Sequence, residues 1–355
     1  MKAAVLHDFK GCVGIEDVPE PVCPADGAIV EIHACGVCRS DHHAWAGVDP
    51  DVKLPWIMGH EFAGFVVETG PDCTMAKGTR VTAPFILGCG TCPDCETGNG
   101  TACNHADVAG FTVPGAFAER IAVPHAGYNL VMLPDALDFD VAAGMGCRVT
   151  TAYRALTDRL ALGAGDWIAV HGCGGVGLSA IQIATALGAR AIAVDISDAA
   201  LTQARAMGAV HCVNAASENV AAAIQDLTDG GADCSIDAMG LTETFMNSLT
   251  CLRKLGRQVQ VGMPVGPHAT VPLPLLDLIY ARQLQLSGSR GIAPQGFAGL
   301  LGLVEAGKVD LSTLVTNRID LSQVSEILHQ MDNFTHSGVT IVDRFGPAPV
   351  ATGAA

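Results

Sequence analysis

Four cysteines lie close together in one stretch rich in glycine and proline. Cys89, Cys92, Cys95 and Cys103 are separated by two, two and seven residues. Zinc favours four thiolates at tetrahedral corners, and two-residue gaps allow a tight turn to direct neighbouring sulfurs at one ion. The alternatives are an iron–sulfur cluster, which also uses closely spaced cysteines, and four unrelated buried thiols. We favour a closed structural zinc site that holds a loop in shape and leaves no position for a substrate.

Three further segments carry residue types that bind metals. They are Cys35 to His43, Gly59 to Glu61, and Gly146 with Cys147. Taken separately, Cys35 and Cys38 could form a redox pair, His60 could be an ordinary core histidine and Cys147 a small buried side chain. Their interpretation depends on the elements that carry them.

The chain from about Asp166 has the alternating pattern of a parallel α/β sheet. Its short apolar runs are Trp167–His171, Ala191–Asp195, Cys212–Asn214, Cys234–Ala238, Gln258–Val261 and Gln283–Ser287. The first five are separated mostly by stretches rich in alanine and leucine, such as 176–187 and 199–207, which predict helices. This rhythm predicts a doubly wound parallel sheet covered on both faces.

The remaining segments predict a second, β-rich domain. Short alternating runs such as 27–33 and 61–68, separated by Pro and Gly, are typical of strands with long loops. Near the end, predicted helices at 297–305 and 322–333 and a strand at 339–343 are too few for a core of their own. We therefore predict a catalytic zinc-binding domain over residues 1–150, a cofactor domain over 151–288, and a segment 289–355 that returns to the first domain.

A glycine-rich turn follows the first predicted strand of the parallel sheet and precedes an apolar helix. It consists of Gly172, Cys173, Gly174, Gly175, Val176 and Gly177. In this context the glycines are typical of a dinucleotide site. Gly172 allows a tight turn, Gly174 lets a pyrophosphate approach the backbone, and Gly177 lets helix and sheet pack closely. The alternative is a glycine-rich turn without a ligand.

Asp195 ends the next predicted strand, eighteen residues after Gly177. A carboxylate there can accept hydrogen bonds from the adenosine ribose and repels a 2′-phosphate, which favours NAD over NADP. The following residues, Ile196 and Ser197, supply no arginine that would reverse this preference.

Together these motifs resemble the zinc-dependent medium-chain alcohol dehydrogenases, from Met1 to about Asp343. The specific match is the run from Cys38 to Trp45 followed by Gly59-His60-Glu61. The resemblance implies a GroES-like catalytic domain, a Rossmann domain, NAD, and two Zn²⁺ per chain. Cys38, His60 and Cys147 would bind the catalytic zinc, and the four clustered cysteines the structural one. Two thiolates and an imidazole leave the fourth position open, which is typical of a catalytic site.

The same resemblance implies roles for neighbours of these ligands. Asp41 would orient His60 through its other ring nitrogen, and Glu61 would face the metal from behind. Ser40 and His43 would be the inner and outer groups of a proton relay. The alternatives are ordinary salt-bridged or solvated acids, a backbone cap for Ser40 and a plain surface histidine for His43.

Further residues are implied for the cofactor. Arg39 would contact the pyrophosphate, and the nicotinamide would lie near Gly262, Met263, Gly288 and Ser289. Two positions depart from the family pattern: Ala200 replaces a frequent lysine, and Val339 replaces a frequent arginine. The departures concern the tightness of NAD binding rather than its identity.

The match also implies a substrate pocket walled by Trp45 and Phe85. Two large rings above the zinc indicate a narrow apolar slot for a small or slender alcohol or aldehyde, unless one ring belongs to the core. A polyol dehydrogenase is disfavoured because its third ligand is usually glutamate rather than a cysteine such as Cys147. A catalytically silent nucleotide-binding relative is the alternative function, and it would be expected to have lost a ligand, a relay hydroxyl or a glycine.

Composition limits the partners. With 20 basic and 36 acidic residues, the net charge of −16 disfavours nucleic acid and anionic membranes. The first ten residues lack the layout of a signal peptide, and fourteen cysteines in a chain of 355 residues indicate metal or thiol chemistry in the cytoplasm. We expect a homotetramer, or otherwise a dimer, formed through the cofactor domains near residues 273–287.

Overall fold

The computed structural model describes residues 1–332 and 338–346, so Asn333 of the predicted last helix lies outside the described residues. The chain forms two compact units. Unit 1 comprises Met1–Cys147, Gly291–Ala298 and the described residues from Asp310 onward; unit 2 comprises Arg148–Arg290 and Gly299–Val309. The division differs from the predicted domains, because residues 148–150, 289–290 and 299–309 belong with the cofactor unit.

Residues 299–309 belong to unit 2 because Gly299 packs against another helix of that unit. A Cβ at Gly299 would lie only 2.1 Å from the hydroxyl oxygen of Tyr153, so the glycine allows the two segments to pack in close contact. Tyr153 lies on α5 (Arg148–Arg154), and Gly299 lies on α10 (Phe297–Glu305).

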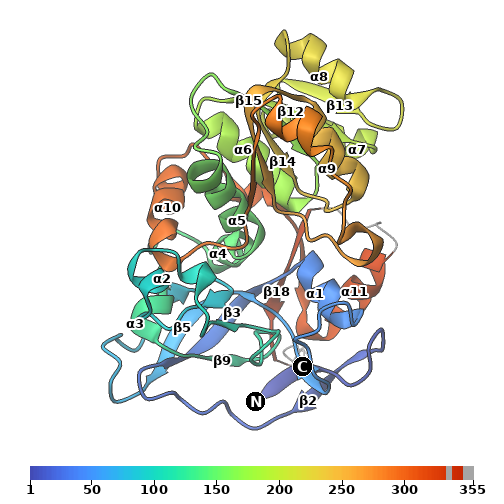
Figure 1. Cartoon of the computed structure of the whole chain (residues 1–355). Helices are drawn as coiled ribbons and strands as arrows, with labels where there is room; N and C mark the ends of the chain where they lie inside the picture. Colours follow the sequence, from blue (N-terminus) through green and yellow to red (C-terminus); the bar gives the residue numbers. More distant parts are fainter. Residues whose placement is uncertain (333–337, 347–355) are drawn as a thin grey trace, which may run out of the picture. The chain divides into compact units, whose positions relative to one another are not determined.

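A seven-stranded sheet forms the frame of unit 1. Its order is β10-β6-β5-β3-β18-β17, with β9 paired to β3. These strands are β3 (Ala28–Val37), β5 (Glu61–Thr69), β6 (Arg80–Thr82), β9 (Arg120–Val123), β10 (Val131–Met132), β17 (Val315–Asp320) and β18 (Val339–Arg344). Figure 1 labels β3, β5, β9 and β18 of this sheet. Smaller sheets contain β1 (Lys2–Leu6), β2 (Val13–Asp17) and β4 (Trp56–Ile57), and the pair β7 (Ile86–Leu87) and β8 (Asp107–Val108). The predicted β-rich domain is confirmed.

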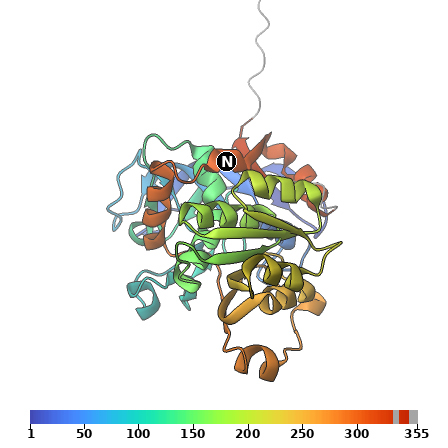
Figure 2. The same ribbon diagram turned by 90° about the horizontal axis from the view of Figure 1, so that it is seen from above.

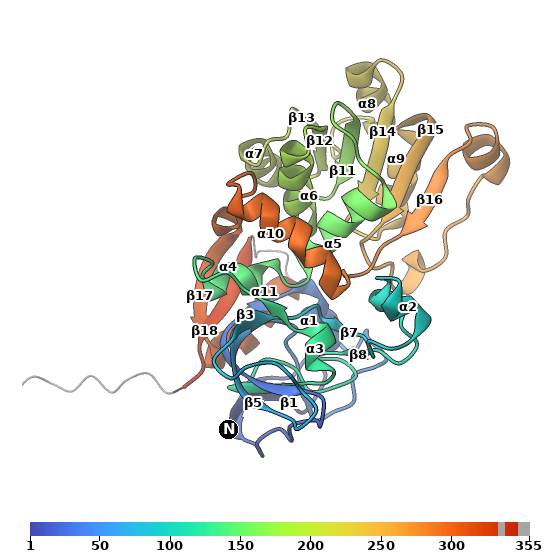
Figure 3. The ribbon, with the colours of Figure 1, turned by 90° about the vertical axis from the view of Figure 1, so that its left-hand side faces the viewer.

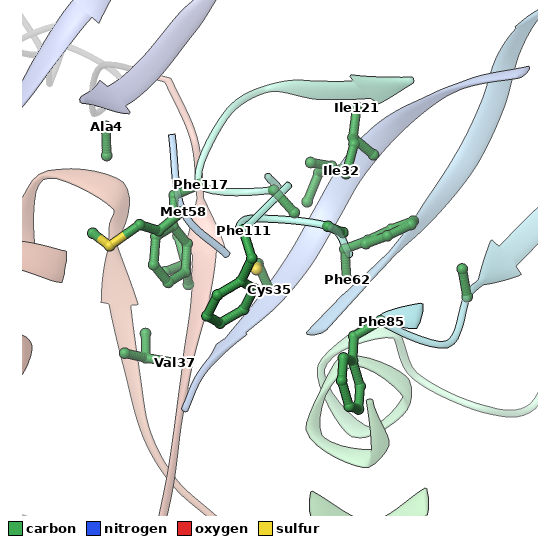
Figure 4. Close-up of a cluster of buried hydrophobic side chains, with 14 of the residues drawn as sticks. Ala4, Ile32, Cys35, Val37, Met58, Phe62, Phe85, Phe111, Phe117 and Ile121 are labelled. Atoms are coloured by element: carbon green, nitrogen blue, oxygen red, sulfur yellow. The ribbon is translucent and has the colours of Figure 1, made fainter. Parts of the chain in front are cut away.

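Helices and one aromatic core complete unit 1. Its helices are α1 (Arg39–Trp45), α2 (Pro93–Glu96), α3 (Ala126–Asn129), α4 (Phe139–Met145) and α11 (Val324–Asp332), with the short turns η1 (Gly100–Ala102), η5 (Pro294–Gly296), η6 (Leu311–Leu314) and η7 (Leu321–Gln323). Phe62, Phe117 and Met58 are fully buried around β3 (Figure 4). The last four residues of β3 and the first four of β5 are buried, so these two strand ends are held in fixed positions. The predicted metal ligands Cys38 and His60 lie directly beside them.

Unit 2 is a parallel sheet of six strands in the order β13-β12-β11-β14-β15-β16 (Figure 3). The strands are β11 (Trp167–His171), β12 (Arg190–Asp195), β13 (His211–Asn214), β14 (Ala232–Asp237), β15 (Leu252–Gln260) and β16 (Gln285–Gly288). This order reverses beside β11, which creates the crevice where doubly wound folds bind nucleotides. The predicted Rossmann fold is confirmed.

The helices of unit 2 pack as two groups. α6 (Gly175–Ala186) and α7 (Asp198–Ala206) pack together against β11, β12 and β13, and α8 (Val220–Thr228) and α9 (Thr242–Thr250) pack together against β13, β14 and β15. α5 continues into η2 (Ala155–Arg159) and packs on α6. The long segment between β15 and β16 carries η3 (Gly266–His268) and the protruding helical turn η4 (Leu275–Tyr280) (Figure 2). None of the helices within the described ranges combines the length and apolarity needed to cross a membrane.

Candidate active site

Three segments of unit 1 bring Cys38, His60 and Cys147 together. Cys38 follows β3 and is the N-cap residue of α1, His60 directly precedes β5, and Cys147 follows α4. The two sulfurs, a ring nitrogen of His60 and a carboxylate oxygen of Glu61 all lie within 4.8 Å of one another. The prediction that these three ligand types form one cluster agrees with this geometry, and Cys35 is absent from the cluster.

Asp41 holds the imidazole of His60 in one orientation. Nδ1 of His60 lies 2.9 Å from Oδ1 of Asp41, and both side chains are fully buried. The same oxygen accepts a hydrogen bond from the backbone N–H of Gly59, while Oδ2 accepts one from the backbone N–H of Cys38. Burial would lower the pKa of His60, but the Asp41 carboxylate and the Cys38 thiolate outweigh it and raise that pKa well above its usual value.

The opposite ring nitrogen of His60 is suited to a metal. Among the described residues, Nε2 of His60 is buried without a hydrogen-bond partner. A buried donor or acceptor is rarely left unsatisfied, because the lost hydration is not recovered. Zn²⁺ binds imidazole nitrogen and thiolate sulfur, so the donors of this cluster fit a zinc ion.

Glu61 lies against the same cluster. Its carboxylate Oε1 accepts a hydrogen bond of 2.9 Å from the backbone N–H of Cys147. Two glycines make room for this side chain: a Cβ at Gly36 would lie 2.2 Å from its Oε2, and a Cβ at Gly146 would lie 2.7 Å from its Cβ. The fully buried carboxylate therefore helps to fix the backbone of a predicted metal ligand.

The predicted relay residues lie on α1. The hydroxyl oxygen of Ser40 is 3.9 Å from the sulfur of Cys38. Burial, followed by the nearby charges of Arg39 and His42, lowers the pKa of His43 below its ordinary value. Nδ1 of His43 is buried with no hydrogen-bond partner within the described part of the chain. The arrangement places a hydroxyl beside the predicted metal ligand Cys38 and a histidine of lowered pKa on the same helix.

Aromatic rings surround His60. The ring centroids of Phe85 and Phe111 lie 5.7 and 5.4 Å from that of the imidazole, both in edge-to-face orientation. Figure 4 labels both phenylalanines within the buried cluster of unit 1. Phe111 was not identified from the sequence, because it belongs to no motif and reaches the cluster only through the fold. Trp45 has the contacts of a core residue: its indole N–H donates to the carbonyl of Gly11, and its ring packs against His329. Its role in the substrate pocket stays a prediction.

The four-cysteine lobe forms a second cluster in unit 1. The sulfurs of Cys89, Cys92, Cys95 and Cys103 all lie within 4.8 Å of one another. Tetrahedral zinc with Zn–S bonds of about 2.3 Å separates its sulfurs by roughly 3.8 Å, so the donors fit one zinc ion. Hydrogen bonds from the backbone and hydroxyl of Thr91 lower the pKa of Cys89 to about 6, whereas burial raises that of Cys95 to about 11.

The glycine-rich turn of unit 2 joins β11 to α6. Gly172 has a φ of +92°, and a Cβ at Gly177 would lie 1.8 Å from the carbonyl oxygen of Gly172, so both positions require glycine. A Cβ at Gly174 would meet no atom within 4 Å, which leaves this backbone open to a ligand. Gly174 is the N-cap residue of α6, and Val176 lies in its first turn. A helix N-terminus preceded by an open glycine backbone fits a pyrophosphate.

Asp195 ties this turn to the end of β12. Its Oδ2 accepts a hydrogen bond of 2.7 Å from the backbone N–H of Cys173, and its Oδ1 accepts one of 2.9 Å from that of Ser197. Each carboxylate oxygen can accept a further bond, so the side chain can still bind ribose hydroxyls.

The other predicted cofactor residues lie at several places. The backbone N–H of Gly262 donates to the carbonyl of Asp237, and Met263 follows it with a partly exposed side chain. Gly288 ends β16, and the backbone N–H of Ser289 donates to the carbonyl of Gln260.

The arginine and the two departing positions also have defined places. Arg39 begins α1 in unit 1, and its guanidinium donates to the carbonyl of Met331. Val339 is fully buried in β18, and Ala200 lies in the first turn of α7.

Comparison with known proteins gives consistent matches. Residues 24–135 match the profile of the alcohol dehydrogenase GroES-like domain, and residues 175–306 match that of zinc-binding dehydrogenases. An alcohol dehydrogenase of Geobacillus stearothermophilus is 34% identical over 335 residues, which cover 94% of this chain and 96% of that protein. An NAD-dependent alcohol dehydrogenase of Sulfurisphaera tokodaii is 33% identical, with 95% and 98% covered. The solved alcohol dehydrogenase TADH from Thermus sp. ATN1 superposes with a TM-score of 0.88 at 30% identity, covering 96% of this chain and 99% of that one.

Proposed function

The chain belongs to the zinc-dependent medium-chain alcohol dehydrogenases, and from this premise we propose that it interconverts a small alcohol and its aldehyde or ketone with NAD. The observation that carries the proposal is the convergence of Cys38, His60 and Cys147 on one point, with Nε2 of His60 buried and lacking a partner among the described residues. The chain is an oxidoreductase that uses zinc and NAD; the number of metals, the residue roles and the substrate are proposals.

We assign one zinc ion to Cys38, His60 and Cys147 and a second to the four-cysteine lobe. When bound, the first supplies a Lewis acid that lowers the pKa of an alcohol hydroxyl, and NAD supplies the hydride acceptor. Asp41 keeps a proton on Nδ1 of His60 and so leaves Nε2 for the metal. Glu61 holds the backbone of Cys147.

The protein must also move the proton released by the alcohol. We assign Ser40 as the inner group, because its hydroxyl lies beside a metal ligand, and His43 as the group that passes the proton to solvent. The lowered pKa of His43 supports this role, because a neutral ring can accept a proton at pH 7.

The cofactor is assigned to unit 2. The open backbone at Gly174 and the N-terminus of α6 support binding of the pyrophosphate, and Asp195 supports NAD rather than NADP. Gly262, Met263, Gly288 and Ser289 remain proposed neighbours of the nicotinamide.

The substrate is proposed to be small and apolar near its hydroxyl. Phe85 and Phe111 both lie edge-to-face with His60, which supports a narrow apolar site beside the proposed zinc. We retain Trp45 as a proposed pocket residue on the family resemblance alone.

We propose the oligomeric state from exposed apolar residues of unit 2, and the cellular compartment from the clustered thiols. Leu275, Leu276 and Tyr280 on η4 expose between 63% and 78% of their surface, and Leu286 on the edge strand β16 is exposed as well. These residues support association through the cofactor unit, as a tetramer or otherwise a dimer. Six thiols in two zinc sites support a reducing compartment, the cytoplasm.

The test is the absorbance of reduced nicotinamide with purified protein, NAD or NADP, and a panel of alcohols and aldehydes. We expect NAD reduction that a zinc chelator abolishes and that added zinc restores. Absence of turnover with every substrate, in protein shown to contain zinc and to bind NADH, would instead favour a nucleotide-binding relative without catalysis.

A further inference from the structure

A buried arginine that belongs to no recognised motif lies against the glycine-rich turn. Arg148 directly follows the metal ligand Cys147 and begins α5, and only 5% of its surface is exposed. α5 packs on α6, and the side chain of Arg148 lies against Gly175 at the start of α6. Arg148 and the turn both belong to unit 2, so their contact is internal to one compact body.

Gly175 provides the passage for this side chain. A Cβ at Gly175 would lie 2.8 Å from Cδ of Arg148 and 3.5 Å from its Nε. Glycine at position 175 therefore allows the Arg148 side chain to lie here, whereas a larger residue would require it to move. Since Gly175 is the first residue of α6, the guanidinium end of Arg148 is held close to the helix N-terminus.

The charge at this place matches the proposed ligand. A helix N-terminus attracts anions. A pyrophosphate carries two negative charges, and backbone N–H groups neutralise only part of them, so a nearby cation would strengthen binding. A guanidinium binds phosphate oxygens through paired N–H donors. Three other positions were considered for such a charge. Ala200 has only a methyl group, and Val339 is a buried apolar residue in the sheet of unit 1. Arg39 is charged but begins α1 in unit 1, whereas Arg148 belongs to the same unit as the turn.

We propose that Arg148 is a cofactor-binding residue that donates to the pyrophosphate of NAD, with Gly175 as the residue that lets it reach that group. The proposal deepens the proposed function and rests on it. It assigns a ligand-binding role to the residue next to a catalytic zinc ligand, so that metal site and cofactor site are joined by consecutive residues of the chain.

The experiment compares Arg148→Gln with the unmodified, zinc-loaded, full-length protein. Binding of NADH is measured by calorimetry, and binding of ADP-ribose and adenosine by displacement of NADH fluorescence. ADP-ribose retains the pyrophosphate, whereas adenosine has no phosphate. We expect NADH and ADP-ribose to bind about ten- to hundredfold more weakly to the variant, as for loss of a hydrogen bond to a charged group, with adenosine changed less than twofold. Arg148→Lys should recover part of the loss.

The matched control is Arg154→Gln, which removes the same charge from the same helix. Arg154 donates to the carbonyl of Arg290, at the far end of α5 from Gly175, so NADH binding should change less than twofold. Zinc content of each variant is measured in parallel, because Arg148 adjoins Cys147. Weakening of adenosine to the same extent as NADH would indicate collapse of the turn and would overturn the proposal.

A second variant tests the contact itself. Gly175→Ala should displace Arg148 and weaken NADH binding, and the double variant Gly175→Ala with Arg148→Gln should be little weaker than either single one, because both remove the same interaction. Additive losses, or unchanged binding of NADH and ADP-ribose to Arg148→Gln, would overturn the proposal. If the unmodified protein bound neither ligand, the cofactor assignment of the proposed function would fail instead.

Discussion

The carboxylate of Asp41 accepts a hydrogen bond from Nδ1 of His60 at 2.9 Å, with both side chains fully buried. The same carboxylate accepts a hydrogen bond from the backbone N–H of Cys38. One acidic residue in the first turn of α1 therefore positions two of the three proposed ligands of the catalytic zinc. Residues in this outer position commonly affect metal affinity almost as much as the ligands themselves.

Replacement of that carboxylate should weaken the catalytic zinc. Asp41→Asn keeps the size of the side chain but removes the charge that stabilises the proton on Nδ1, so we expect about ten- to hundredfold lower zinc affinity. The measurement is zinc retention against a competing chelator, with the zinc of the four-cysteine lobe as internal reference. Asp51→Asn on an exposed loop is the matched control, and equal retention in both variants would argue against the role of Asp41.

Cys147→Ala should abolish turnover and leave NADH binding nearly intact. Loss of one of three protein ligands removes a thiolate from the catalytic zinc, whereas the nucleotide-binding turn belongs to unit 2. Steady-state rates and NADH titration measure the two effects separately. Full activity in this variant would show that the ligand assignment is wrong.

Cys95→Ala should act on stability rather than on chemistry. Its sulfur is one of four that converge in the lobe, and the variant should contain one zinc ion per chain instead of two. We expect unfolding at a temperature lower by about 5 °C or more, equivalent to roughly 2 kcal/mol. Cys12→Ala, which removes an exposed free thiol, is the control for thermal unfolding. Unchanged stability and zinc content would remove the structural role of the lobe.

The pH dependence of kcat/KM for alcohol oxidation should reflect the protonation of His43. Burial, with Arg39 and His42, lowers its pKa below 6.5, so the ring is neutral at pH 7 and gains a proton only under more acidic conditions. A protonated ring cannot accept the proton of the alcohol, and kcat/KM for oxidation should therefore fall as the pH decreases through that pKa. His43→Gln should lower the rate at pH 7 about tenfold and flatten this acidic limb. His33→Gln, at an exposed histidine, is the control. A limb of the pH profile that persists in His43→Gln would exclude His43 as its origin.

Much of the fold could be predicted because its signals are local. The run from Trp167 to His171 and the glycines after it define a strand, a turn and a helix start through properties of adjacent residues. The spacing of the four cysteines predicts their convergence for the same reason. Both predictions depend on short segments whose geometry is fixed by the chain itself.

The features that could not be predicted from the sequence depend on packing between segments that are distant along the chain. Phe111 lies beside His60 after strand β8, which pairs with β7, and no sequence pattern marks it. The boundary at residues 299–309 depends on the close approach of Gly299 to Tyr153. Trp45 is buried and its indole N–H donates to the carbonyl of Gly11, a contact that no sequence motif indicates. The place beside the substrate that the family resemblance implies for Trp45 stays a prediction.

The preference for NAD should depend on the charge of Asp195. Both of its oxygens accept hydrogen bonds from backbone N–H groups, so Asp195→Ala would remove the charge and both hydrogen bonds. Asp195→Asn removes the charge, retains one acceptor and gives up only one of the two hydrogen bonds, so it disturbs the turn less. A neutral side chain no longer repels a 2′-phosphate, so we expect the ratio of kcat/KM for NAD to that for NADP to fall about tenfold or more. Asp198→Asn in the first turn of α7 is the control for charge in the same region. A ratio that changed equally in both variants would show that general surface charge, rather than the carboxylate at the end of β12, selects the cofactor.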